Sequence, residues 1–353
     1  MTQALYRKYR PKKFSEVQGQ EHIVKVLEAS VKSGRISHAY LFSGPRGTGK
    51  TSVARILASE IGCHEYDLFE MDAASSRGID EIRSLREGVH VMPLKGKCKV
   101  YIVDEVHMLT KEAFNALLKT LEEPPAHAIF MLATTEPEKL PDTIVSRCQH
   151  FSFKKIPEDI LAESVLKVAK KEGFEMDEES AGLVALFSDG SFRDSQVMLD
   201  QLLSIADKNK DKKISGREAR EILSAPSKDL IRDFVLAVLD ADTDKGFSVL
   251  QKIVEKGMAV QLFLKFVLRD IRAILMLKLS PKSEELLLKI LGKDEMEFLK
   301  SKKDTLSVKD LGFTLFLLLD AYDKTNRAYL PQLPLELTLA KIQLRKQGGV
   351  DAR

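Results

Sequence analysis

Residues 44–51, Gly-Pro-Arg-Gly-Thr-Gly-Lys-Thr, have the types and spacing of a loop that binds phosphate. An apolar run at 39–42 reads as a buried strand before it, and residues 52–58 have helical spacing after it. Glycines let backbone N–H groups turn towards an anion, and the helix start adds its positive dipole end. Lys50 would reach the outer phosphates, and the Thr51 hydroxyl would hold Mg²⁺. The candidate nucleotide-binding residues here are Gly44, Pro45, Arg46, Gly47, Thr48, Gly49, Lys50, Thr51 and Ser52.

A second candidate group is the acidic pair Asp104 and Glu105, which ends an apolar run at 99–103. A strand buried on both faces that ends in two acids needs a partner, because buried carboxylates are costly without one. Mg²⁺ bound to a nucleotide supplies that partner. Asp104 would lie beside the metal, and Glu105 would polarise the attacking water.

The pattern of apolar and polar residues from 39 to 153 predicts the strands and helices that would position these residues. Short apolar runs alternate with helical segments there, which predicts a parallel sheet covered on both faces. We place strands near 39–43, 68–72, 99–104, 128–134 and 149–153, and a helix over 21–33 capped by Ser15 or a neighbour. From about 158 the strand signals stop, and helical periodicity continues to about 346 with breaks at 189–191, 207–213 and 225–226.

Composition fits a soluble protein of two or three domains. The 353 residues are 44% hydrophobic and 30% charged, and a net charge of +3 offers no global polycation to nucleic acid. The three cysteines, Cys63, Cys98 and Cys148, have no metal or redox spacing, so we expect reduced thiols in a cytoplasm. No signal peptide is recognisable, and the apolar run at 313–319 is too short to span a bilayer.

Several segments together resemble the bacterial clamp-loader ATPases of the AAA+ class, the gamma/tau family of DNA polymerase III. They are residues 9–14, 17–20, 37–44, 103–109, 115–125, 146–148, 190–194 and 333–337. The resemblance covers essentially the whole chain. It implies an α/β P-loop AAA+ domain with a five-stranded parallel sheet, then a small helical lid domain and an all-α collar domain. The expected divisions are 1–156, 157–224 and 226–347, the last being the oligomerisation domain.

The resemblance also implies the function. A ring of five subunits, including delta and delta-prime types, opens a sliding clamp and places it on primer-template DNA, with no membrane involved. ATP and Mg²⁺ are the cofactors, and ATP lies at subunit interfaces.

Further site residues follow from the same resemblance. Thr134 or Thr135 matches the polar sensor of the γ-phosphate or water, and Arg193 matches the second sensor, on the lid. Taken alone, the threonines read as a strand-end turn and Arg193 as a surface arginine. The residues that would lie against the adenine are Tyr9, Arg10, Pro11 and Val17.

Arg147, in Ser-Arg-Cys, has no signal of its own and reads as a loop arginine in a local salt bridge. In the family that the chain resembles, it is the arginine finger, which points at the ATP of the neighbouring subunit. Its guanidinium would neutralise charge that develops on the transferred phosphoryl group.

The sequence departs from the family in two places. The usual four-cysteine zinc module is missing, and Cys63 alone cannot hold zinc, so we expect no metal besides Mg²⁺. This short connection at 62–67 also looks like the small subunits of archaeal and eukaryotic clamp loaders. The C-terminal extension of the tau form is not found after the collar.

Three other functions fit parts of the sequence. Residues 104–107 also match the DExH box of helicases, but we find no second ATP-binding lobe and no Gln-x-x-Gly-Arg motif. A delta-prime-like scaffold subunit would lose the P-loop, and Lys50 and Thr51 are intact. A nucleotide kinase would need an acceptor pocket and lid arginines that nothing marks.

Two arginines are candidates for contact with DNA. Arg77 and Arg83 could contact template phosphates, or could equally lie on a solvated helix face.

Overall fold

The computed structural model describes residues 3–75, 79–209, 212–280 and 282–348. Contacts divide the chain into two units. The first contains Met1–Phe174 and Val184–Lys212, and the second contains Glu175–Leu183 and Lys213–Arg353. The three domains expected at 1–156, 157–224 and 226–347 remain a prediction.

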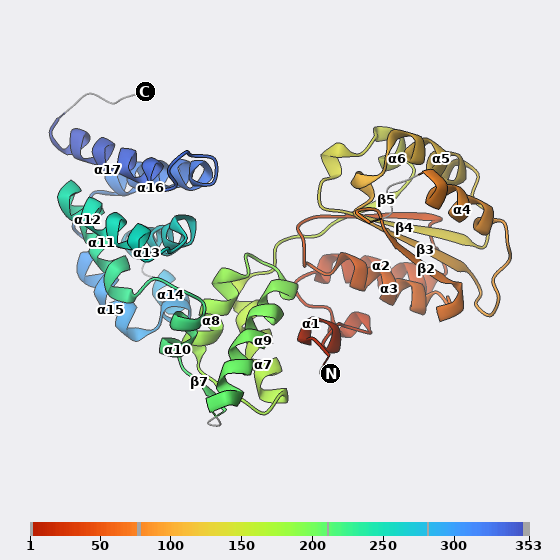
Figure 1. Cartoon of the computed structure of the whole chain (residues 1–353), viewed down its shortest axis with the longest axis horizontal. Helices are drawn as coiled ribbons and strands as arrows, with labels where there is room; N and C mark the ends of the chain where they lie inside the picture. The colour runs from red at the N-terminus through yellow and green to blue at the C-terminus, as the bar shows by residue number, and fades with distance from the viewer. Residues whose placement is uncertain (1–2, 76–78, 210–211, 281, 349–353) are drawn as a thin grey trace. The chain divides into compact units, whose positions relative to one another are not determined.

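The first unit is built on a parallel sheet in the order β2-β3-β4-β1-β5, which confirms the predicted fold (Figure 1). Its strands are β1 (Ala39–Ser43), β2 (Leu68–Asp72), β3 (Lys99–Asp104), β4 (Ala128–Thr134) and β5 (Gln149–Ser152). Only β5 differs from the prediction, by one residue, although the Phe153 N–H still donates to the Ser43 carbonyl at 2.7 Å.

Helices cover both faces of this sheet (Figure 1). One face packs against α2 (Glu21–Ser33) and α3 (Lys50–Glu60), and the other against α4 (Ile79–Val89), α5 (Lys111–Glu122) and α6 (Asp142–Val145). Every residue of β1 is buried, and alternate side chains enter the two cores: Tyr40 and Phe42 on one side, Ala39 and Leu41 on the other. Burial on both faces is why this strand reads as a continuous apolar run.

The other elements of the first unit are short or helical. They are α1 (Leu5–Lys8), α7 (Glu158–Lys171), α9 (Phe192–Asn209) and the 3₁₀ turns η1 (Phe14–Glu16), η2 (Glu65–Asp67), η3 (Val106–Met108) and η4 (Pro137–Lys139). Helix α8 (Glu178–Phe187) belongs partly to each unit. Ser15 lies within η1 and does not cap α2; the N-cap residue is Gln20, which makes no side-chain capping bond.

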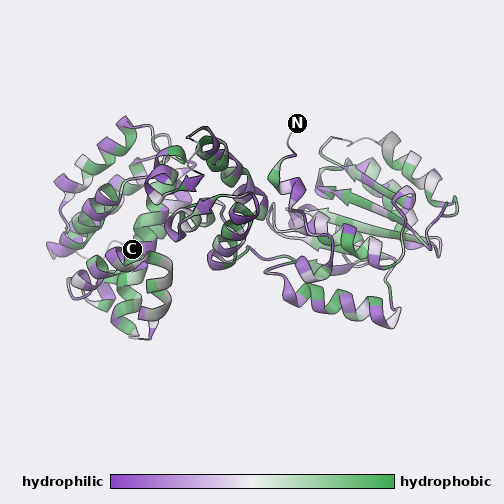
Figure 2. Ribbon diagram, turned by 90° about the horizontal axis from the view of Figure 1, so that it is seen from below, coloured by the Kyte–Doolittle hydropathy of each residue, from purple (hydrophilic) through white to green (hydrophobic). Residues whose placement is uncertain are grey.

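The second unit is helical except for one small pair of strands. Its further helices are α10 (Gly216–Ile222), α11 (Lys228–Asp240), α12 (Thr243–Glu255), α13 (Val260–Leu279), α14 (Ser283–Leu291), α15 (Lys293–Lys302), α16 (Val308–Thr325) and α17 (Leu333–Lys346). Hydrophilic and hydrophobic residues alternate along them (Figure 2). Among the described residues, no helix is both long and apolar enough to cross a membrane. Strands β6 (Glu175–Met176) and β7 (Lys213–Ile214) correct the expectation that strands end near 158. Each has only two residues, which is too short to show the alternation of polar and apolar side chains that marks a strand in a sequence.

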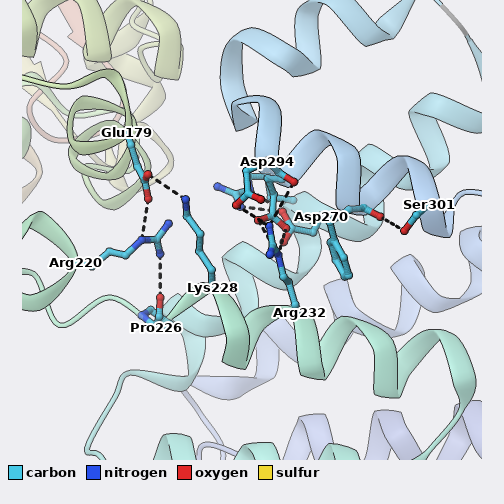
Figure 3. A network of polar contacts seen from close by, with 11 residues as sticks. Glu179, Arg220, Pro226, Lys228, Arg232, Asp270, Asp294 and Ser301 are labelled. Atoms are coloured by element: carbon cyan, nitrogen blue, oxygen red, sulfur yellow. Dashed lines mark hydrogen bonds and ion pairs between the residues drawn. The ribbon is translucent and has the colours of Figure 1, made fainter. Parts of the chain in front are cut away.

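A network of charged side chains holds α11 against α15 in the second unit (Figure 3). Arg232 donates from Nη2 to Glu295 Oε2 and to Asp294 Oδ2, each at 3.0 Å. Its guanidinium carbon also lies 5.0 Å from the centroid of the Phe298 ring. Because Glu295 is itself buried, the ion pair offsets the cost of removing its charge from water.

Asp270 on α13 is the most deeply buried acid of this network. Its Oδ1 accepts from Arg269 Nε at 2.9 Å, whereas Oδ2 has no hydrogen-bond partner. Burial, and to a lesser extent the negative charge of Glu295, raises the pKa of Asp270 to about 6 despite the opposing charge of Arg269. The carboxyl is therefore neutral more often than an exposed aspartate at mildly acid pH.

This raised pKa should make the second unit less stable as pH rises. The folded-state pKa of about 6 lies above the ordinary 3.8, so the contribution of Asp270 is full below about pH 4 and lost above about pH 6. Between these pH values, the shift lowers the free energy of unfolding by about 3 kcal/mol. Asn cannot ionise, so Asp270→Asn should remove this slope, the decrease in the free energy of unfolding with rising pH. Urea unfolding followed by circular dichroism near pH 4 and pH 7 measures it.

Glu297→Gln is the matched control, because it removes an exposed carboxyl from the neighbouring α15. It should keep the slope of the parent protein. A slope that survives in Asp270→Asn would show that other groups cause the pH dependence.

Candidate active site

The predicted phosphate loop connects β1 to α3, and its glycines adopt a backbone that other residues rarely accept. Gly44, Gly47 and Gly49 have φ values of 134°, 74° and 104°. Lys50 is buried at the start of α3, where its Nζ donates to the carbonyls of Gly44 at 2.7 Å and Pro45 at 2.9 Å. Burial lowers the pKa of Lys50, and the charges of Glu105 and Asp104 oppose this effect.

The loop and the end of β3 meet as the sequence predicts. Thr51 Oγ1 donates to Asp104 Oδ2 at 2.7 Å, and the Glu105 N–H donates to Asp104 Oδ1 at 3.0 Å. A hydroxyl and a carboxylate thus lie side by side next to the loop. This is the ligand pair that a nucleotide-bound Mg²⁺ requires from a P-loop protein.

Glu105 has an unusual backbone and a fixed side chain. Its φ of 47° lies in the left-handed region, which costs a non-glycine residue roughly 1 kcal/mol or more. Its Oε2 accepts from Thr135 Oγ1 at 2.9 Å and from the Thr135 N–H at 3.3 Å. Two hydrogen bonds from Thr135 thus hold this carboxylate at the end of β4.

Thr134 has a different partner from Thr135, although both were candidates for one role. Thr134 is fully buried at the end of β4, and its Oγ1 lies 3.0 Å from His107 Nδ1. His107 Nε2 in turn lies 3.2 Å from Glu136 Oε1. Sequence reasoning gave Glu136 no role and considered His107 only as the last residue of a possible DExH box. The available signals were the position of His107 just after the acidic pair and that of Glu136 just after the threonines.

The predicted adenine-contacting residues lie after α1. Arg10 Nε donates to Ser52 Oγ at 2.9 Å, which ties this segment to α3. Tyr9 instead donates its hydroxyl to Glu172 after α7; burial first, and this carboxylate second, raise the pKa of Tyr9 to about 12. Val17 packs against the core beside α2 and α3, and Pro11 is half-buried.

The first residues of α9 reach the phosphate loop directly. The Phe192 N–H donates to the Gly47 carbonyl at 3.0 Å. A Cβ at Gly47 would lie 1.9 Å from Ser191 Oγ and 3.3 Å from Arg193 Cβ, so this approach requires glycine. The Arg193 guanidinium lies 5.1 Å from the centroid of the Tyr6 ring. The structure thus places Arg193 beside the loop and next to Tyr6, and its sensor role stays a prediction.

Arg147 has local partners on its own chain. It donates from Nη2 to Glu122 Oε1 and from Nη1 to the Thr143 carbonyl, both at 2.7 Å. Its side chain is 34% exposed, so it remains accessible from outside. Arg46, at the tip of the phosphate loop, is exposed as well.

Two of the cysteines that are distant in sequence come together. The hydrogen bond with Cys98, and then burial, raise the pKa of the Cys63 thiol. Over the part of the chain that the structure describes, no group of three or more His, Cys, Asp or Glu residues could hold a metal ion. The expectation that the protein binds no zinc stays a prediction. Arg77 and the Arg83 side chain lie outside what the structure describes.

The parallel sheet, with its phosphate loop after β1 and an acidic pair at the end of β3, defines a P-loop α/β protein. A family model described as DNA polymerase III, delta subunit, matches residues 19–76 and 66–157. A model of DNA polymerase III subunits gamma and tau domain III matches residues 214–347. The chain belongs to the gamma/tau family of DNA polymerase III subunits.

Similar proteins agree with this assignment. The DNA polymerase III subunit gamma of Buchnera aphidicola is 36% identical over 301 residues, which are 79% of this chain and 82% of the relative. The subunit tau of Bacillus subtilis is 40% identical over 309 residues, which are 82% of this chain and 54% of the relative. The chain thus spans about half the length of several relatives that it matches.

A solved structure also shares the fold. The RuvB Holliday junction branch migration motor of Thermotoga maritima matches with a TM-score of 0.53 and 21% identity, over 65% of this chain and 79% of that chain. At this identity the likeness speaks for the fold alone.

The contact between the phosphate loop and α9 can be tested at Gly47. Gly47→Ala places a Cβ against Ser191 and strains the backbone, so the bond from Phe192 should weaken. Loss of one hydrogen bond should speed amide exchange at the start of α9 roughly five- to tenfold. Hydrogen exchange with mass spectrometry on peptides from this segment measures the effect.

Gly49→Ala is the control, because its φ is also positive but its Cβ would meet nothing within 4 Å. It should strain the loop and leave exchange at the start of α9 unchanged. Equal exchange in both variants would mean that backbone strain, and not the contact with α9, is responsible.

Proposed function

We propose that this chain is an ATP-hydrolysing motor subunit of a bacterial clamp loader. ATP binding would open the sliding clamp for loading on primed DNA, and hydrolysis would release it. The hydrogen bond from Thr51 to Asp104 carries the proposal, because it joins the helix after the phosphate loop to the acid that ends β3. Membership of the gamma/tau family gives this site its biological setting.

The chain's own residues divide the work in this proposal. The loop from Gly44 to Ser52 and the Lys50 ammonium bind the phosphates, while Thr51 and Asp104 hold Mg²⁺. The ion would neutralise charge on the phosphate oxygens. Glu105 orients the attacking water, and Thr134 or Thr135 and Arg193 act as sensors. Tyr9, Arg10, Pro11 and Val17 contact the adenine.

The partners proposed here are those that the resemblance to the bacterial clamp-loader ATPases implies. We propose a five-subunit ring with delta- and delta-prime-type subunits that acts on a sliding clamp and primer-template DNA in the cytoplasm. Residues 226–347 would form the collar that joins the subunits, and 157–224 the lid over the nucleotide. The gamma/tau domain III model over 214–347 supports the first assignment. In such a ring, Arg147 would reach the ATP of the neighbouring subunit.

Glu105→Gln should separate binding from chemistry. The amide oxygen can still accept from Thr135, so the local structure should be kept, while the negative charge that orients water is lost. We expect ATP affinity within about twofold of the parent and turnover lower by at least about 10²-fold. Calorimetry and an ATPase assay with clamp and primed DNA measure the two. Lost affinity would show that Glu105 holds the metal or the fold.

Arg147→Ala should bind ATP normally and hydrolyse it poorly in the assembled complex. Arginine fingers contribute on the order of 10³-fold or more, although a slow loading step can mask part of this. The decisive measurement mixes Lys50→Ala and Arg147→Ala subunits with the other clamp-loader components. Some interfaces then pair an intact loop with an intact arginine, so activity should return.

If Arg147 acted within its own subunit, every subunit in the mixture would lack one essential group. No activity would then return although sizing showed an assembled complex. Glu122→Gln is the control for the ion pair seen here, because it removes the partner of Arg147 and keeps the arginine. It should hydrolyse ATP at least as fast as the parent protein.

A further inference from the structure

A hydrogen-bonded cluster outside the phosphate loop lies at the carboxyl ends of β3 and β4. It contains Glu105, His107, Thr134, Thr135 and Glu136. The His107 side chain is only 5% exposed, and one or other of its ring nitrogens faces three of these residues. The proposed function uses Glu105 and the threonines but gives His107 no task.

The partners determine where the imidazole carries its hydrogen. Glu136 Oε1 lies 3.2 Å from Nε2, and an ionised carboxylate can only accept, so Nε2 carries a hydrogen. Thr134 Oγ1 already accepts from the Glu136 N–H at 3.0 Å, which leaves its own hydrogen free. With hydrogen on Nε2, the ring offers Nδ1 as the acceptor for that hydrogen, 3.0 Å from Thr134 Oγ1. Glu136 therefore selects the form of His107 that orients the Thr134 hydroxyl.

The same ring borders the proposed water-orienting carboxylate. His107 Nδ1 lies 3.4 Å from Glu105 Oε2, the oxygen that Thr135 also holds. In this form of the ring, Nδ1 has no hydrogen to donate, so both hydrogen bonds to Glu105 Oε2 come from Thr135 and the ring acts on Glu105 by contact alone. Removing the ring would take away the acceptor of the Thr134 hydroxyl and the side chain that packs against Glu105.

We propose that His107 is a positioning residue for ATP hydrolysis, held by Glu136 and acting through Thr134 and Glu105. It touches neither nucleotide nor water in this role. The inference rests on the proposed function, because it deepens the account of the same site. It predicts that the neighbouring Glu136, 39% exposed and without another assigned role, affects hydrolysis only through His107.

Two amide variants separate positioning from simple packing. An Asn side chain reaches about as far as Nδ1 of histidine, and a Gln side chain about as far as Nε2. His107→Asn can thus still accept from Thr134, whereas His107→Gln keeps only the contact with Glu136. Single-turnover hydrolysis in the assembled complex should stay within about threefold of the parent for Asn and fall roughly tenfold or more for Gln and Ala. ATP affinity should be unchanged in all three.

The role of Glu136 is tested by a double-mutant cycle. Glu136→Ala alone should slow hydrolysis about as much as His107→Ala, because the ring then loses its orientation. Added to His107→Ala, it should cost nothing further. If the double variant hydrolysed ATP more slowly than either single variant, by the product of their two effects, Glu136 would not act through His107. Equal rates for His107→Asn and His107→Gln would also overturn the proposal.

His127→Gln is the matched control, because it makes the same change at a half-buried histidine before the amino end of β4. It should hydrolyse ATP like the parent. A loss equal to that of His107→Gln would show that any histidine replacement disturbs the sheet, which would overturn the positioning role.

A measurement without turnover distinguishes the failure of this inference from the failure of the proposed function. In protein labelled with ¹⁵N-histidine, the ring shifts of His107 should report hydrogen on Nε2, and Glu136→Ala should abolish this preference. A parent complex without ATPase activity would overturn the proposed function, whatever the shifts show. Hydrogen on Nδ1, or shifts indifferent to Glu136→Ala, would overturn the inference even in an active enzyme.

Discussion

The site depends on one constraint: the strands of a doubly covered parallel sheet can place polar groups only at their ends. β1, β3 and β4 are buried throughout their central parts, so charge is excluded until each strand leaves the core. Because the strands are parallel, these exits lie at one edge. The phosphate loop, Asp104 and Thr134 therefore meet there, although long stretches of chain separate them.

Collecting so many charges at one edge has a cost, and the hydrogen bonds of the site offset it. Lys50 is buried beside loop carbonyls, Asp104 accepts from Thr51, and Glu105 accepts from Thr135. Burial lowers the pKa of Lys50, but the two acids oppose that shift and favour its charged form. A positively charged lysine next to the loop is what phosphate binding requires.

Segments from outside the sheet complete the surroundings of the loop. Phe192 donates to the Gly47 carbonyl, Arg193 lies over Tyr6, and Tyr9 donates to Glu172. The start of the chain and the helices after β5 are thus joined to each other as well as to the loop. A change in the loop would act directly on the bond from Phe192, because its acceptor is the carbonyl of the loop residue Gly47.

The sequence by itself determined the strands, the phosphate loop and the roles open to Lys50, Thr51, Asp104 and Glu105, because buried parallel strands and tight anion-binding turns restrict residue types locally. Only the tertiary structure decided that Thr134 pairs with His107 and Thr135 with Glu105, since both threonines fit the same local pattern. It also decided the deep burial of Asp270 and the contact between the free thiols of Cys63 and Cys98. These features depend on which elements pack together, and side-chain orientation across such contacts leaves no periodic signal in the chain.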